Sequence, residues 1–243
     1  MRMLNFAHRN FKELVRDPLS LVFEIALPLF LLFIFQQFNL PDEIYRIENF
    51  TPSIILFGFG FITLFSATLI AKDRSTSLLI RLGTSPMKSS DYILGYVISI
   101  IPIILIQEIL FFILAMILGL SFSINMIYTV LMSLVVSILF ISLGILIGSI
   151  ASEKGVGGIG SIIVQLVCFT SGMYFPKELV GGVFKVICEL LPFESCLNII
   201  KGTLNNDFSI ITTQNIITFV IYTIVILILS IIVFKKKMVS DNK

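Results

Sequence analysis

The chain has 243 residues, of which 57% are hydrophobic and only 13% are charged, with a formal net charge of +2. Its mean hydropathy of +1.04 excludes an ordinary soluble globular domain. The charges are also segregated, because long stretches carry none and the segments between them carry nearly all. This distribution indicates an integral membrane protein.

Six apolar runs are long enough to cross a bilayer, since a run of roughly 18 apolar residues can span the hydrocarbon core as a helix. They cover residues 19–37, 51–71, 92–118, 124–150, 156–175 and 214–234. No alternation typical of strands occurs, so we predict an all-α integral membrane protein with six transmembrane helices. We expect one membrane domain over 1–243, with spans one to five in 19–175 and a basic tail at 235–243.

The positions of lysine and arginine predict the orientation in the membrane. Six spans place both termini on the same side. On the opposite side we count only four of the 17 basic residues, which are Arg46, Lys177, Lys185 and Lys201. The same segments hold seven acidic residues: Asp42, Glu43, Glu48, Glu178, Glu189, Glu194 and Asp207. We therefore expect both termini on the cytoplasmic side of the cell membrane.

Residues 1–18 are predicted to form an interfacial elbow helix, because apolar and polar side chains separate onto two faces at helical spacing. The apolar face consists of Leu4, Ala7, Phe11, Leu14 and Val15, and the polar face of Asn5, Arg9, Lys12 and Arg16. Such a helix lies in the headgroup layer with its cations toward anionic lipid. Asp17-Pro18 should end it and begin the next helix. The alternative is that these basic residues merely flank the first span.

Residues 72–91, KDRSTSLLIRLGTSPMKSSD, form a charged loop between two apolar runs. The serines and threonine at 75–77 can cap a short helix, and Gly83 can end it. Leu78, Leu79 and Leu82 would be exposed there, as suits a helix that docks into a groove on a partner protein. The chain has no GxxxxGK[ST] phosphate-binding loop, so we do not expect it to hydrolyse ATP by that route. Residues 72–91 are therefore predicted to contact a partner protein that supplies the energy for transport.

Residues 176–213 are predicted to form an outer hairpin of two short helices, which dip into or lie on the outer leaflet. Their apolar stretches are too short to cross, and Gly181-Gly182 and Pro192 interrupt them. Cys188 and Cys196 lie in this hairpin, where we expect free thiols.

The candidate functional side chains within the predicted spans are Glu24, Glu108 and Gln165. A carboxylate at the bilayer centre costs roughly 2.5–3.5 kcal/mol on insertion scales, so it tends to face protein or a wet cavity. Glu24 and Glu108 therefore have two interpretations, a role in a transport pathway or an interhelical hydrogen bond made by the protonated acid. Gln165 fits the structural role better. The only histidine is His8, in the elbow, so no metal site is predicted.

Two further motifs stand out in the sequence. The first is Asp73-Arg74 followed by Leu79, Arg81, Leu82 and Ser85-Pro86. The second is Ser171-Gly172 and Pro176, followed by Leu191-Pro192-Phe193. Both motifs resemble those of the type-2 permease family of ATP-binding-cassette (ABC) exporters. The resemblance covers essentially the whole chain. The sequence departs from the family pattern at Ser77-Leu78 and at Lys201.

The resemblance implies a half-transporter that is not itself an enzyme and binds no cofactor. Two permease chains, identical or related, would form a cavity in the bilayer, and separate ABC ATPase subunits would hold ATP and magnesium. No nucleic acid is expected as a partner. The implied ATPase contacts are Arg9, Lys12, Arg16, Asp17, Asp73, Arg74, Leu78, Leu79, Arg81, Leu82 and Pro86. Ser171, Gly172, Pro176 and Pro192 would shape the outer hairpin.

The leading hypothesis is export of an amphiphilic drug or antimicrobial peptide. Export of a lipid or lipid-linked glycan is the alternative within the same family. A proton-coupled secondary transporter, with Glu24 or Glu108 as the proton carrier, is the alternative from another class.

Overall fold

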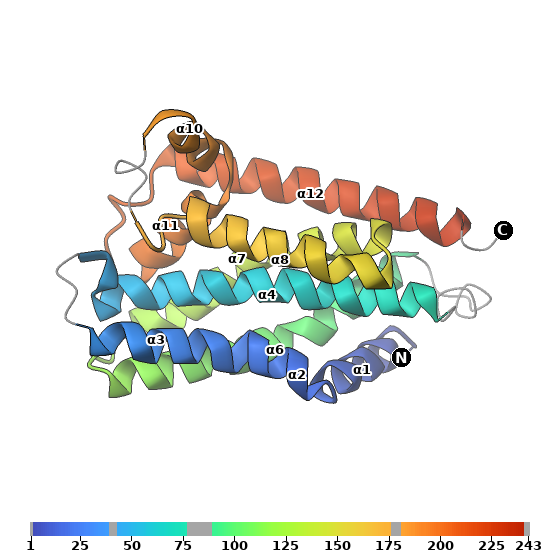
Figure 1. Cartoon of the computed structure of the whole chain (residues 1–243), viewed down its shortest axis with the longest axis horizontal. Coiled ribbons are helices and arrows are strands. Elements are labelled where there is room, and N and C mark those ends of the chain that lie inside the picture. The colour runs from blue at the N-terminus through green and yellow to red at the C-terminus, as the bar shows by residue number, and fades with distance from the viewer. Residues whose placement is uncertain (1, 39–42, 77–88, 176–180, 241–243) are drawn as a thin grey trace.

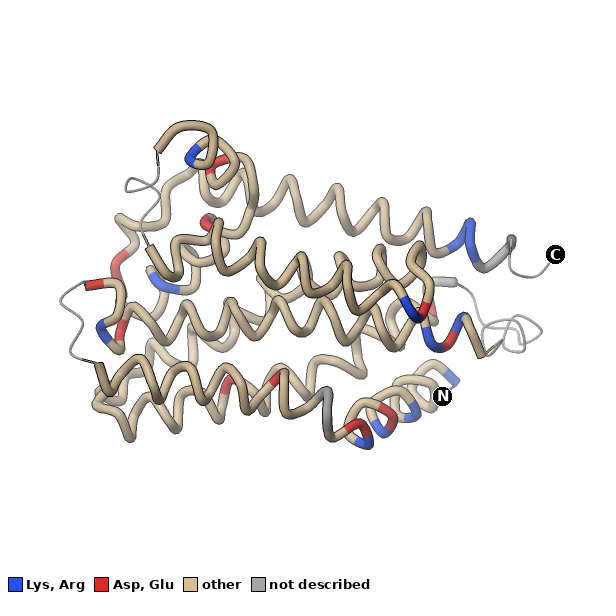
Figure 2. Tube along the Cα trace, in the orientation of Figure 1, with Lys and Arg blue, Asp and Glu red and all other residues tan. Residues whose placement is uncertain are grey.

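The computed structural model describes residues 2–38, 43–76, 89–175 and 181–240. These residues are predominantly helical and contain no strand, which confirms the all-α prediction for the part of the chain described. Long helices run side by side in a bundle, with α1 at one end and α10 at the other (Figure 1). We call these the α1 end and the hairpin end. Charged residues gather mainly at these two ends (Figure 2).

The helices follow one another with short connections. A π-helix at Val22–Ala26 joins α2 to α3, and a 3-10 turn at Glu43–Tyr45 precedes α4. The α-helices are α1 (Arg2–Val15), α2 (Pro18–Leu21), α3 (Leu27–Gln37), α4 (Ile47–Ser75), α6 (Ser89–Ile117), α7 (Asn125–Ile150), α8 (Glu153–Thr170), α10 (Gly182–Leu190), α11 (Phe193–Leu204) and α12 (Thr213–Ser240).

Four helices in the described residues are long and apolar enough to cross a membrane: Ile47–Ser75, Ser90–Ile117, Asn125–Ile150 and Thr213–Lys237. They correspond to the predicted second, third, fourth and sixth spans. The segment of the predicted first span contains only a shorter apolar helix, Val22–Gln37. The fifth corresponds to α8, which ends at Thr170 rather than at residue 175. Gly172, with φ of +82°, takes the left-handed conformation just beyond that end. Six spans thus remain a prediction.

Helix α4 occupies the centre of the bundle. Most of its side chains are buried, and it packs against α3, α6, α7, α8 and α11. Close approach of α7 requires a glycine, because a Cβ atom at Gly148 would lie 2.6 Å from the carbonyl oxygen of Ala67. Helix α12 lies at the periphery, and only 11% of the residues in its most apolar stretch are buried. A helix with so much exposed apolar surface requires lipid or another protein around it.

The predicted hairpin contains two short helices, α10 and α11. Gly181 and Gly182 have positive φ values of +63° and +55°, which only glycine adopts easily, and Pro192 directly precedes α11. Helix α11 inserts between α4, α7 and α12, and most of its side chains are buried. Cys188 and Cys196 are both buried, and no disulfide joins them in the described residues, which agrees with the expectation of two thiols.

Candidate functional site

Helix α1 packs directly against α6. Phe6 inserts its ring between two tyrosines of α6 and meets both edge-on, with centroid distances of 5.4 Å to Tyr92 and 5.1 Å to Tyr96. Gly95 makes room for this ring, because a Cβ atom there would lie 2.5 Å from Cδ1 of Phe6. The elbow segment is therefore a helix held by protein contacts, in addition to any contact with lipid.

The structure divides the predicted apolar face of α1 between two environments. Ala7 and Leu14 are buried against the protein, whereas Leu4 is 56% and Val15 46% exposed. The reason is that α6 lies along only one side of the helix. Hydrophobic periodicity identifies apolar side chains but does not say which of them contact protein.

Asp73, near the end of α4, has a fully buried carboxylate. Arg9 Nη1 donates hydrogen bonds to both of its oxygens, at 2.7 Å to Oδ1 and 2.9 Å to Oδ2. The hydroxyl of Tyr96 donates a third bond to Oδ2 at 2.8 Å. One carboxylate therefore joins α1, α4 and α6, three segments that are far apart in the sequence.

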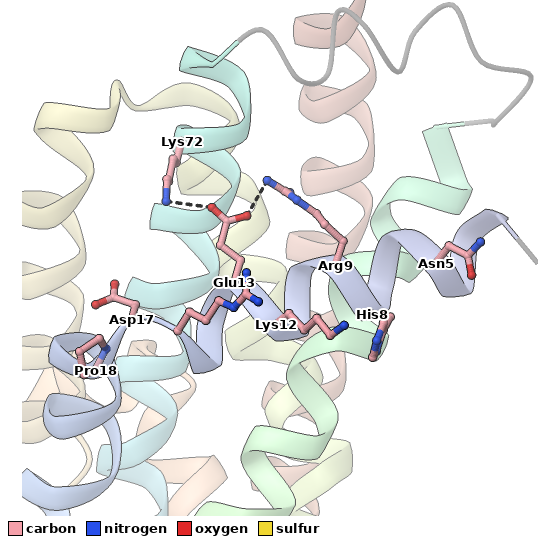
Figure 3. A pocket seen from close by; sticks show the side chains of 9 residues that line it. Asn5, His8, Arg9, Lys12, Glu13, Asp17, Pro18 and Lys72 are labelled. Carbon is pink, nitrogen blue, oxygen red and sulfur yellow. Dashed lines mark ion pairs between the residues drawn. The ribbon is translucent and has the colours of Figure 1, made fainter.

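Glu13 extends this arrangement. Its Oε2 accepts from Nη2 of Arg9 at 2.5 Å, and its Oε1 lies 2.9 Å from Nζ of Lys72 (Figure 3). We call Arg9, Glu13, Lys72, Asp73 and Tyr96 the Asp73 cluster. Because its two acids alternate with its two cations, each charge in it has a partner of opposite sign.

The last turn of α4 is also bonded to α7 and α8. Arg74 Nη1 donates to the backbone carbonyl of Gly148 at 3.0 Å and to that of Ala151 at 3.3 Å. A cation at the carboxyl end of α7 satisfies carbonyls that lack partners within the helix. Ser75 Oγ donates to Oε2 of Glu153, at the start of α8, at 2.5 Å. The turn that precedes residues 77–88 is thus connected to four other helices.

The residues predicted to contact an ATPase fall into three groups: those bonded within the bundle, those lining a groove, and those outside the described residues. Arg9 and Asp73 bond directly to each other, while Arg74 bonds to α7. Lys12, Arg16 and Asp17 instead line an open groove of about 670 Å³ beside the cluster, which we call the cationic groove. Its remaining lining residues are Asn5, His8, Arg9, Glu13, Pro18 and Lys72. The other predicted contacts lie outside the described residues: Leu78, Leu79, Arg81, Leu82 and Pro86.

The two acids of the predicted spans lie in the middle of the bundle. Glu24 belongs to the π-helix and is 2% exposed, and Gln107 Nε2 on α6 donates to its backbone carbonyl at 3.1 Å. Glu108 is fully buried, and Ser133 Oγ on α7 donates to its Oε1 at 2.6 Å. This bond joins α6 to α7, with the hydroxyl as donor and the Glu108 carboxyl as acceptor. Among the described residues, no hydrogen bond reaches Oε1 of Glu24 or Oε2 of Glu108.

Gln165 lines a cavity whose lining residues include neither acid. The cavity has a volume of about 300 Å³ and lies between the first predicted span, α4 and α8. The other lining residues are Phe23, Leu27, Phe61, Leu64, Phe65, Ser161 and Val164. Neither Glu24 nor Glu108 therefore shares this cavity with Gln165.

The hairpin motif is seen only in part. Ser171 is buried directly after α8, Gly172 has the positive φ described above, and Pro192 is buried before α11. Pro176 lies outside the described residues.

Sequence reasoning missed several members of the site. Glu13 follows Arg9 by four residues, and this spacing was a usable signal for an ion pair on a helix. Tyr96 gave no such signal, since it lies inside an apolar run and its partner is on another helix. The packing of Phe6 over Gly95 was equally hidden, because it depends on how α1 and α6 meet.

Comparison with known protein families identifies the family of this chain. Residues 3–205 match the family profile described as ABC-2 type transporter. The matched range extends from α1 through α11 and includes the whole Asp73 cluster. The chain belongs to the ABC-2 type transporter family. A comparison with curated proteins gave no match. An ABC-2 type chain is a membrane transport subunit, generally not catalytic itself, and the family implies association with an ABC ATPase.

Proposed function

We propose that this ABC-2 type chain is the membrane subunit of an ATP-driven exporter that moves an amphiphilic drug or antimicrobial peptide outward across the bacterial cytoplasmic membrane. The α1 end would face the cytoplasm, with both termini on that side and the hairpin outside. The observation that carries the proposal is the Asp73 cluster, because it lies directly before residues 77–88. Those residues contain the leucines expected to dock on an ATPase.

The bonds around the end of α4 support a coupling role. Asp73 connects α4 to α1 and α6, and Arg74 and Ser75 connect it to α7 and α8. A displacement of residues 77–88 by an ATPase would therefore act on five helices rather than on α4 alone. Because helices are stiff, a rotation at the α1 end changes the packing farther along the bundle.

The cavity at Gln165 supports an amphiphilic substrate. Its lining is mainly aliphatic and aromatic, and the amide of Gln165 and the hydroxyl of Ser161 supply the polar groups. Such a mixture suits a ligand with a large apolar part and few polar groups.

We propose that the exposed face of α8 also meets a second permease chain. Gly157 and Gly158 on α8 have nothing within 4 Å of a Cβ position and permit close approach of another helix.

The docking role of residues 77–88 is tested by Leu82→Asp. We expect this variant to insert normally but to lose most ATP-dependent uptake of a fluorescent amphiphile into inverted vesicles that contain the ATPase. Leu190→Asp, at the exposed hairpin end, is the matched control and should retain uptake. Normal uptake by an inserted Leu82→Asp protein would refute the docking role.

Export of a lipid-linked glycan would give a different phenotype, because deletion of the gene would remove a surface polymer and leave drug resistance unaltered.

The proton-coupled alternative is tested with Glu24→Gln and Glu108→Gln. For an ATP-driven exporter we expect both variants to transport, and transport to require the ATPase. If transport instead persists without any ATPase, and an uncoupler or either variant abolishes it, the chain is a secondary transporter.

A further inference from the structure

The cationic groove carries more positive charge than the Asp73 cluster uses. Glu13 is bonded to Arg9 and Lys72, so these three charges largely satisfy one another. Within the part of the chain that the structure describes, no ion pair joins Lys12 or Arg16 to an acid. Asp17 is the other acid in the lining. The groove therefore has spare cationic groups that are not needed to hold α1 to α4.

The spacing along α1 places these cations beside an apolar stripe. His8, Lys12 and Arg16 follow one another at intervals of four residues and form one row on the helix. Figure 3 shows Arg9 and Glu13 directed toward Lys72, with His8 on the opposite side of α1.

The neighbouring row contains Leu4, Phe11 and Val15. Leu4 and Val15 are about half exposed, and Phe11 is partly exposed. The opposite side of α1, with Phe6 and Leu14, is buried in the protein. Helix α1 thus presents an uncovered apolar row and a cationic row side by side.

We propose that the cationic groove binds the phosphate headgroup of an anionic phospholipid. Lys12 and Arg16 contact the phosphate, and the acyl chains lie along Leu4, Phe11 and Val15. The guanidinium group of arginine and the ammonium group of lysine are the side-chain groups best suited to donate hydrogen bonds to phosphate oxygens. The volume of about 670 Å³ accommodates a headgroup, and the groove is open, so a lipid can enter from the side.

The uncovered apolar row favours a lipid over an acidic surface of the ATPase. A protein partner that used only Lys12 and Arg16 would leave Leu4 and Val15 in water, whereas a phospholipid covers both rows at once. This inference is independent of the exporter proposal, since it requires only that α1 lies at a membrane surface.

The test measures lipid binding to the purified full-length chain in neutral detergent by native mass spectrometry. The probes are a short-chain phosphatidylglycerol, the corresponding phosphatidylcholine, and soluble glycerol phosphate. We expect the anionic lipid to bind most tightly and glycerol phosphate to bind weakly. Lys12→Gln with Arg16→Gln should weaken phosphatidylglycerol binding about fivefold for each cation removed, or about 25-fold together. Val15→Ser should weaken binding of both lipids.

The control is Lys154→Gln with Lys236→Gln, which removes the same charge from exposed residues that do not line the groove. We expect its binding to change less than twofold. Equal loss in this control, or unchanged binding in the Lys12/Arg16 variant, would overturn the proposal. Equal affinity of the unmodified chain for phosphatidylcholine and phosphatidylglycerol would also overturn the proposal. Glycerol phosphate bound as tightly as the lipid would indicate a site for a soluble phosphate. If the Lys12/Arg16 variant retains lipid binding but loses a co-purified ATPase, the groove is a protein contact.

Discussion

The α1 end and the middle of the bundle both bury carboxyl groups, but they surround them differently. Asp73 accepts three hydrogen bonds, from Arg9 and Tyr96, and these bonds cross between helices. Within the described residues, Glu24 and Glu108 each retain an oxygen without a partner. A buried carboxylate with a cation and a full set of donors can hold helices together, whereas an incompletely bonded acid cannot do so equally well.

This difference has a consequence for mutation. Removal of one partner of a buried ion pair leaves the other charge buried and uncompensated, which costs more than the pair itself contributes. Removal of a single hydrogen bond, with no loss of a countercharge, costs less. Substitutions at the α1 end should therefore destabilise the protein more than equivalent substitutions in the middle of the bundle.

The largest effect is expected for Arg9→Gln. This change leaves Asp73 buried without its cation, and we expect the free energy of unfolding to fall by about 2–3 kcal/mol. That is less than the roughly 3–5 kcal/mol of a fully buried pair, because the Arg9 side chain is 39% exposed. Thermal unfolding in detergent can be followed with a thiol-reactive dye, which reacts as the buried cysteines become accessible: Cys168, Cys188 and Cys196.

Arg46→Gln is the matched control for this measurement. Arg46 pairs with Glu43, but both side chains are more than two-thirds exposed, so the loss should be below about 1 kcal/mol. Equal destabilisation by the two substitutions would show that the Asp73 pair contributes no more than a surface ion pair.

Two hydroxyl deletions compare the regions directly. Tyr96→Phe removes one donor from Asp73 and keeps the ring contacts with Phe6, and we expect a loss of about 1.5 kcal/mol because the acceptor is paired with a cation. Ser133→Ala removes the donor to Glu108 and should cost about 0.5–1 kcal/mol. Unfolding by the same dye assay measures both. A larger loss for Ser133→Ala would reverse the comparison.

An effect smaller than that of Tyr96→Phe is expected for packing at the α1 end. An alanine at Gly95 would crowd Phe6, and after the gain in helix propensity of about 1 kcal/mol we expect a net loss of about 1 kcal/mol. Gly157→Ala on α8 is the control, since nothing lies within 4 Å of a Cβ there, and its stability should rise slightly. The same midpoint for both variants would mean that α1 is held by its ion pairs alone.

The sequence was sufficient for the long helices because their signal is local. Length and hydropathy located both ends of α4, α6 and α7 to within about four residues and the start of α12 to within one, and Asp17-Pro18 correctly marked the end of α1. The site was predicted only in part. Asp73 and Arg9 were both named as coupling residues, but nothing in their spacing indicated that they bond to each other across 64 positions. The π-helix around Glu24 was also unpredicted.

The composition by itself determined that this is a membrane protein made of helices, because backbone groups in a bilayer must bond within their own segment and an apolar run of sufficient length becomes a helix. The motifs around Asp73 and Pro192 also indicated the family from their residues alone. Only the tertiary structure decided which side of α1 is covered by protein and which buried acids have partners. The physical reason is that a side chain in an apolar helix acquires its role from the helix beside it, and the contact between helices is not encoded in the periodicity of either one.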